Sequence, residues 1–181
     1  KWTEARRFGP HVFRVLTLDV SPDGKLLAAG GGEPAKSGEI KIWNVADGKL
    51  VRSLDGLHSD TVFTVKFSPD GSKLLTGAAD KFVKIANVAD GKELKSFEGH
   101  THHVLGADWK SDGKQLVTAG ADGAVKFWEY ESGEQLRSSQ GTMKAFTGIR
   151  WPADKPRAIV ACADGSVREV TASNAQFSKT L

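Results

Sequence analysis

Cysteine is nearly absent from this chain of 181 residues, in which Cys162 is the sole example. An intramolecular disulfide is therefore excluded, and cysteine content says nothing about the redox compartment. No apolar run approaches the roughly 20 residues that a membrane-spanning helix needs. The first residues, from Lys1 to Arg7, lack the apolar core of a secretory signal. We therefore expect a soluble protein without a membrane span, and whether it is cytoplasmic or periplasmic stays open.

Motifs for cofactor or metal chemistry are also missing. The chain has no Cys-x-x-Cys-His segment for haem attachment, no His-Glu-x-x-His segment and no phosphate-binding glycine loop before a helix. Three histidines, His100, His102 and His103, lie close together in the sequence. Because adjacent side chains of an extended segment point to opposite sides, His102 and His103 should point apart. We therefore predict no metal, no cofactor and no enzymatic activity.

Charge of one sign does not dominate either. Lys and Arg number 25 against 22 Asp and Glu, which gives a formal net charge of +3. A nucleic-acid-binding protein usually gathers its basic residues on one face or stripe. Here they are spread over similar places along the chain, which is typical of a solvated surface and disfavours nucleic acid as the partner.

What the chain does contain is a recurring turn. Its copies begin at Ser21, Ser68, Ser111 and, in a degenerate form, at Pro152, and their Asp residues are separated by 47, 42 and 42 positions. Proline fixes the first corner of such a turn and glycine accepts the positive φ that follows. A repeat at this spacing indicates an array of similar structural units.

Short apolar segments keep phase with the turns. Before each turn, apolar and other residues alternate, as in Val62 to Phe67, which is the pattern of a half-buried strand. A second, a third and a fourth short apolar segment follow each turn. No segment has a sustained helical period. We therefore predict an all-β protein of about four β-propeller blades, each of four antiparallel strands. A single blade cannot bury both of its faces, so such units must stack.

At this point the sequence resembles the WD-repeat family. The resemblance rests on Gly99-His100, on the Ser-Pro-Asp-Gly turns, on Gly120 to Gly123 and on Val125 to Trp128, and it spans nearly all of residues 8–181. The style of the repeats, as in Asn44 to Lys49, is similar to bacterial members.

The resemblance implies a buried hydrogen-bonded set of His, Ser or Thr, Asp and Trp in each complete blade. The third copy has all four members, the second has three with Ala86 in place of Trp, the first has His11 and Trp43 beside Ala28 and Ser37, and the fourth keeps Asp164 beside Thr142, Val160 and Val170. The members in the two better copies are His100, Thr118, Asp122 and Trp128, and His58, Thr76 and Asp80. A catalytic triad is the alternative interpretation, but recurrence at equivalent positions favours a structural role.

The repeat also predicts the boundaries of the units. These are a leading strand in residues 1–10, blades in 11–57, 58–99 and 100–141, and a degenerate blade in 142–181. Residues from Trp2 to Phe8 align with the fourth strand of a preceding blade, and Gln176 to Leu181 with that of the last blade. Rings of this family usually have about seven or eight blades. The chain is thus expected to be part of a larger ring, completed by other blades or by a second copy, or else an open array.

The resemblance implies a protein–protein interaction scaffold. Partners of the family usually dock on the rim where first strands begin and where turns join second to third strands. These positions, together with two charged residues of an insertion in residues 31–38, are Arg14, Thr61, His103, Ala145, Ala79, Ala121, Ala163, Glu33 and Lys36. The alternative is the propeller part of a larger bacterial multidomain protein, in which a haem or enzymatic domain elsewhere carries the chemistry.

Overall fold

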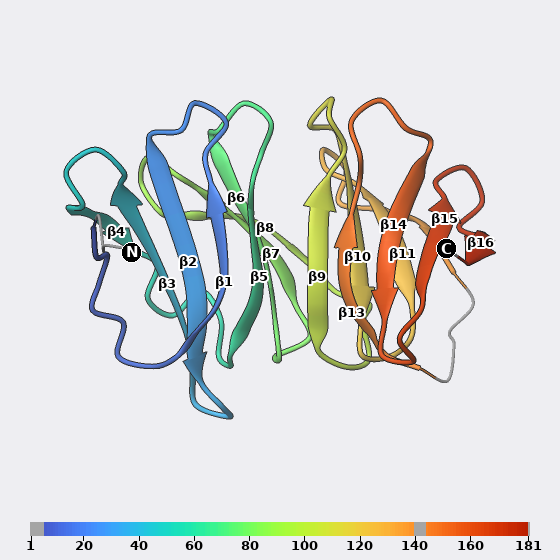
Figure 1. Cartoon of the computed structure of the whole chain (residues 1–181), viewed down its shortest axis with the longest axis horizontal. Coiled ribbons are helices and arrows are strands. Elements are labelled where there is room, and N and C mark those ends of the chain that lie inside the picture. The colour runs from blue at the N-terminus through green and yellow to red at the C-terminus, as the bar shows by residue number, and fades with distance from the viewer. Residues whose placement is uncertain (1–5, 140–143, 181) are drawn as a thin grey trace, which may run out of the picture.

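The computed structural model describes residues 6–139 and 144–180 and contains four sheets of four strands each. The sheets follow one another along the chain and stand side by side, from the first at the left of Figure 1 to the fourth at the right. The described residues contain no helix, and hence none that is long and apolar enough to cross a membrane. The prediction of an all-β chain with four four-stranded antiparallel units is confirmed.

Each sheet is a simple antiparallel meander in which strands pair in chain order. The first sheet consists of β1 (Val15–Val20), β2 (Leu26–Glu33), β3 (Ser37–Asn44) and β4 (Leu50–Ser53). The second consists of β5 (Val62–Phe67), β6 (Lys73–Ala78), β7 (Val83–Asn87) and β8 (Glu93–Phe97). The third consists of β9 (Val104–Trp109), β10 (Gln115–Gly120), β11 (Val125–Glu129) and β12 (Gln135–Ser138). The fourth consists of β13 (Phe146–Arg150), β14 (Arg157–Cys162), β15 (Val167–Thr171) and β16 (Phe177–Thr180).

The recurring turn joins the first strand of a sheet to the second. In the first sheet the Ser21 hydroxyl donates to Asp23 at 2.7 Å, and the same carboxylate accepts the Lys25 amide at 3.1 Å. Gly24 follows with a φ of 74°, a value that L side chains rarely adopt. Side chains thus satisfy the backbone of the turn locally, which explains why its sequence recurs with each sheet.

The core lies between the sheets. One cluster joins the first and second sheets, with Ile40 and Ile42 against Val62 and Val65. Equivalent clusters join the second to the third sheet and the third to the fourth. The first strands β1, β5, β9 and β13 lie next to one another in succession. The second and third sheets therefore each bury one face against the preceding sheet and the other against the following sheet, as stacked propeller blades do.

Carboxylates on two first strands link neighbouring sheets. Asp19 of β1 accepts hydrogen bonds from the Phe67 amide at 2.9 Å and the Lys66 ammonium at 2.8 Å. Asp108 of β9 similarly accepts the Trp151 amide at 2.8 Å. The contact lies between the first and second sheets in one case and between the third and fourth in the other. Each link holds the first strand of one sheet in register with that of the next.

The leading segment has no strand in its described part, residues 6–10; Trp2 to Ala5 lie outside the described residues. Phe8 packs edge-on against Trp43 at 6.4 Å between ring centroids, as Phe97 packs against Trp128 at 5.6 Å. Phe97 ends β8, the fourth strand of the sheet preceding that of Trp128. Phe8 therefore occupies the place of a fourth-strand end, and assigning residues 1–10 to a neighbouring blade stays a prediction.

The insertion in the first repeat lengthens two strands. Strands β2 and β3 have eight residues each and pair as far as Glu33 with Ser37. The resulting hairpin extends beyond the neighbouring sheets at the lower edge of Figure 1. The Ala35 amide donates to Asp60 at 2.8 Å, so the tip of the hairpin is fastened to the segment that precedes the second sheet.

Candidate interaction rim and buried hydrogen-bonded sets

The third sheet brings four predicted residues into one buried hydrogen-bonded set. His100 Nδ1 lies 2.9 Å from Asp122 Oδ2, and His100 Nε2 lies 2.8 Å from Thr118 Oγ1. The Trp128 indole N–H donates to the same hydroxyl at 2.9 Å. Since a carboxylate can only accept, Nδ1 carries the proton, and Nε2 of the neutral ring accepts from the hydroxyl. The donations run from Trp128 to Thr118 to His100 to Asp122.

The second sheet repeats this arrangement without the indole. His58 Nδ1 lies 2.9 Å from Asp80 Oδ2, and His58 Nε2 lies 2.8 Å from Thr76 Oγ1. Ala86 occupies the tryptophan position, and the Thr76 hydroxyl lies within 3.1 Å of the Lys84 carbonyl oxygen. Both hydroxyls are fully buried, so a substrate has no access to them as nucleophiles.

In the first sheet, Ser37 stands where the family pattern has Asp, and Glu39 supplies a carboxylate instead. His11 Nδ1 lies 3.1 Å from Glu39 Oε2, and the Val12 amide and Lys41 ammonium also contact this carboxylate. Burial opposes ionisation of Glu39, but these partners outweigh it and hold its pKa at about 2. Both ring nitrogens of His11 lack a well-aligned hydrogen bond among the described residues: Nδ1 lies near Glu39 without good hydrogen-bond geometry, and Ala28 stands where the hydroxyl would face Nε2. One signal for Glu39 was present in the sequence, since it is an acidic residue two positions after Ser37.

The fourth sheet has no such set in its described part. Asp164 accepts the Ser166 hydroxyl and the Arg168 guanidinium, each at 2.6 Å. Val160 and Val170 are buried at the other two positions, and Thr142 lies outside the described residues. Apolar packing replaces the hydrogen-bonded set in this sheet.

Because of the carboxylates of Asp80 and Asp122, the free energy of unfolding should depend on pH in the acidic range. Burial is the largest influence on Asp122 and raises its pKa. Hydrogen bonds from His100 and from the Thr101 and Ala124 amides outweigh burial, so the pKa lies below the ordinary value of 3.8. Such a group stabilises the fold above its ordinary pKa, and this contribution is lost as the pH falls through the folded-state pKa.

We expect Asp122→Asn to weaken the pH dependence of unfolding below about pH 4, because the group that gains a proton on unfolding is gone. The measurement is the free energy of unfolding in urea at a series of pH values from 7 to 2, for this variant and for the parent chain. The variant should be less stable than the parent chain at pH 7, and the difference between their free energies of unfolding should become smaller as the pH is lowered. A gap that stays constant down to pH 2 would contradict the expectation.

The predicted rim residues meet in pairs at one edge of the sheets. The amide that precedes each turn Asp donates to the carbonyl just before a first strand, from Ala79 to Thr61 at 2.9 Å, from Ala121 to His103 at 2.8 Å and from Ala163 to Ala145 at 2.9 Å. Glu33 and Lys36 pair at 2.9 Å at the tip of the β2–β3 hairpin. Arg14 is exposed just before β1.

Two of these positions are corrected by the structure. Thr61 is 2% exposed and Ala79 is 8% exposed. Their side chains are therefore unsuitable as contacts for a partner. Arg14, His103 and Lys36 keep accessible side chains.

The sequence analysis did not predict the aromatic stack of Phe63 and His103. The rings of Phe63 and His103 lie 5.8 Å apart at an interplanar angle of 25°. Phe63 sits at a register irregularity between Val62 and Thr64, and Leu105 has the equivalent place in β9. Bulges of this kind re-aim a side chain. Alternation along β5 gave no signal that Phe63 departs from the pattern.

The prediction that His102 and His103 point apart was wrong. The chain bends at this point instead of continuing as a strand, and the two rings lie 4.3 Å apart. The His103 amide donates to His102 Nδ1 at 2.9 Å. The described residues contain no group of three or more His, Cys, Asp or Glu side chains placed to hold a metal ion.

Comparison with known proteins agrees with this geometry. The family model described as "WD domain, G-beta repeat" matches residues 2–44, 48–87 and 91–129. Each of the last two ranges contains the fourth strand of one sheet and the first three strands of the next. The matched ranges stop before the fourth sheet, which lacks the hydrogen-bonded set.

The chain is also similar to parts of several larger proteins. It is 35% identical over 95 residues to Protein HIR1 of Kluyveromyces lactis, covering 44% of this chain and 11% of that protein. It is 30% identical over 114 residues to Elongator complex protein 2 of Saccharomyces cerevisiae, covering 60% and 14%. It is 32% identical over 97 residues to the mouse F-box-like/WD repeat-containing protein TBL1X, which covers 54% of this chain and 17% of that protein. The chain thus spans less than a fifth of the length of these relatives.

Proposed function

Because this chain belongs to the WD-repeat family, we propose that it is a non-catalytic scaffold that binds a protein partner through the rim where its first strands begin. The observation that carries the proposal is the joint placement of Arg14, Phe63 and His103 at this edge, beside the projecting β2–β3 hairpin. Aromatic and Arg side chains are the types that most often dominate binding energy in protein interfaces.

The rim offers both apolar and polar contacts. Phe63 is half-buried and Leu16, at the equivalent place in β1, is 40% exposed. His103 stacks on Phe63, and the charged residues Arg14, Glu33 and Lys36 belong to the same edge. A centre of apolar groups within a polar surround is the usual composition of a protein-binding patch. The rigid sheets behind it hold these groups in place without a partner.

Two finer points belong to the same proposal. We propose that the chain works within a ring of about seven or eight blades, as members of the family do. Where the whole protein carries chemistry, we assign it to another domain, as in the alternative of a larger multidomain protein. The bacterial style of the repeats stays a prediction.

The test is a comparison of two double charge reversals at opposite edges of the sheets. Arg14→Glu with His103→Glu alters the rim, whereas Lys25→Glu with Lys114→Glu alters exposed turns at the other edge. Immobilised parent and variant chains are incubated with extract of the source cells, and bound proteins are quantified by mass spectrometry. We expect the rim variant to lose at least about tenfold of its specifically bound partner, and the control to retain it. Equal binding by both variants would refute the rim.

A further inference from the structure

One exposed lysine at the proposed rim has an unusual backbone conformation. Lys81 stands in the turn between β6 and β7 with a φ of 76°. The equivalent residues of the third and fourth sheets are Gly123 and Gly165, with φ values of 72° and 84°. This left-handed region is sterically unfavourable for an L side chain and open to glycine. The second sheet therefore has a lysine where the geometry of the turn favours glycine.

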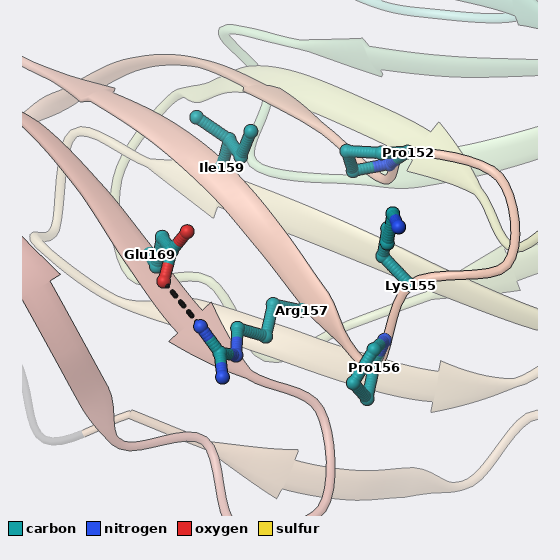
Figure 2. A pocket seen from close by; sticks show the side chains of 6 residues that line it. All are labelled: Pro152, Lys155, Pro156, Arg157, Ile159 and Glu169. Carbon is teal, nitrogen blue, oxygen red and sulfur yellow. Dashed lines mark hydrogen bonds and ion pairs between the residues drawn. The ribbon is translucent and has the colours of Figure 1, made fainter. Parts of the chain in front are cut away.

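The side chain of Lys81 makes no contact that would offset this conformational cost. It is exposed, and it has no hydrogen bond or ion pair with another described residue. Some other cations are paired, as Figure 2 shows for Arg157, whose guanidinium lies 2.7 Å from the Glu169 carboxylate. The second sheet has a neighbouring sheet on each flank, so Lys81 reaches solvent at the rim. Backbone strain that brings no internal contact points to a function of the residue that bears it.

The carboxylates in the turns between second and third strands and directly before the first strands are engaged within the fold. Each accepts a hydrogen bond or forms an ion pair; these residues are Glu33, Asp60, Asp80, Asp122 and Asp164. Arg14, before β1, is exposed like Lys81 and likewise has no hydrogen bond or ion pair with a described residue. The charge that this edge presents to a partner through these two side chains is therefore positive.

The order of the sheets places both cations near the aromatic stack that Phe63 forms. The Ala79 amide donates to the Thr61 carbonyl at 2.9 Å, which joins the turn of Lys81 to the segment that enters β5 just before Phe63. Arg14 directly precedes β1, which lies beside β5. An aromatic centre and flanking cations thus belong to one continuous part of the rim.

We propose that this part of the rim binds an acidic segment of a protein partner. Lys81 and Arg14 contact carboxylates of that segment, and the stack of Phe63 on His103 packs against one of its apolar side chains. The inference rests on the proposed function, because it names the chemistry of the partner that the same rim binds.

Charge complementarity and the apolar centre together favour an acidic peptide over nucleic acid. Nucleic acid binds through many phosphate contacts along a basic face or stripe, and Arg14 and Lys81 supply few of these. A peptide segment offers carboxylates and an apolar side chain side by side. Ion pairs at the margin of an interface set partner choice and association rate, whereas burial of side chains at its centre provides most of the affinity.

A library of random peptides displayed on phage, selected on the immobilised parent chain, tests the chemistry of the partner. We expect the enriched sequences to carry several Asp or Glu residues around an aromatic or aliphatic residue. One enriched peptide is then synthesised with a fluorescent label, and its affinity for each chain is measured by fluorescence anisotropy. Enriched peptides without an excess of negative charge would overturn the inference.

Lys81→Gly tests the lysine itself, because it removes the cation and relaxes the turn at the same time. We expect this variant to bind the peptide at least about fivefold more weakly, while its midpoint of thermal unfolding rises by about 1–3 °C. Lys25→Ala removes an exposed cation from the opposite edge and should change the affinity by less than about twofold. Unchanged peptide binding by Lys81→Gly, or a lower midpoint of unfolding, would overturn the role given to Lys81.

Two further measurements separate this inference from the proposed function. A labelled single-stranded oligonucleotide that binds the parent chain more tightly than the peptide does would overturn the choice of an acidic peptide. Enriched peptides that are neutral or basic, and that Arg14→Glu with His103→Glu no longer binds, would leave the rim in place and refute its acidic partner. Acidic peptides that bind the parent chain and this rim variant equally would refute the rim itself.

Discussion

Replacing Thr118 by Val should lower the free energy of unfolding by about 2–4 kcal/mol, because two buried groups lose their partner at once. The Trp128 indole N–H and His100 Nε2 both meet the Thr118 hydroxyl, at 2.9 and 2.8 Å. Valine has nearly the same shape, so the loss reports on hydrogen bonding more than on packing. Urea unfolding followed by tryptophan fluorescence and circular dichroism gives the measurement.

Thr76→Val is the matched control in the second sheet. Thr76 is equally buried and bonds His58 in the same way, but Ala86 supplies no indole. Thr76→Val should therefore lower the free energy of unfolding by less, about 1–2 kcal/mol, because only His58 loses a side-chain hydrogen-bond partner. Equal losses in the two variants would show that the indole bond contributes nothing to the fold.

The second large effect is expected from Gly106→Ala, which should cost about 1–3 kcal/mol. A Cβ at Gly106 would lie 2.8 Å from the Ile149 amide nitrogen and 3.0 Å from Gly148 Cα. These are backbone atoms of β13, so the clash can be relieved only by moving the third and fourth sheets apart. The lack of a side chain at Gly106 allows β9 and β13 to approach closely here.

Gly148→Ala provides the control across the same interface. A Cβ there meets nothing within 4 Å, and alanine also narrows the unfolded ensemble. The control should be unchanged or more stable by about 0.4–1 kcal/mol. Thermal unfolding of both variants beside the parent chain gives the comparison. A Gly106→Ala chain as stable as the Gly148→Ala chain would mean that the sheets are not in close contact at this point.

The edge that we propose as an interaction rim was predictable from the sequence in its position but not in the accessibility of its side chains. The phase of the repeat places His103 and Ala121 at positions that recur in the other blades. In the structure the Ala121 amide donates a 2.8 Å hydrogen bond to the His103 carbonyl. Accessibility, however, depends on what covers each site from neighbouring segments. That is why Thr61 is buried, whereas Arg14 at the equivalent place is exposed. The stack of Phe63 on His103 arises from an irregular register that no local pattern encodes.

The sequence by itself determined the kind of unit and its number in this chain. Alternation of apolar residues and the Ser–Asp–Gly turns act over a few positions, so they specify strands and hairpins without reference to the rest of the molecule. Tertiary structure decided which side chains meet across sheets. It brings Glu39 to His11 and fits Gly106 against β13. These contacts join residues far apart in the chain, and their geometry follows from the stacking of whole sheets, which local periodicity does not contain.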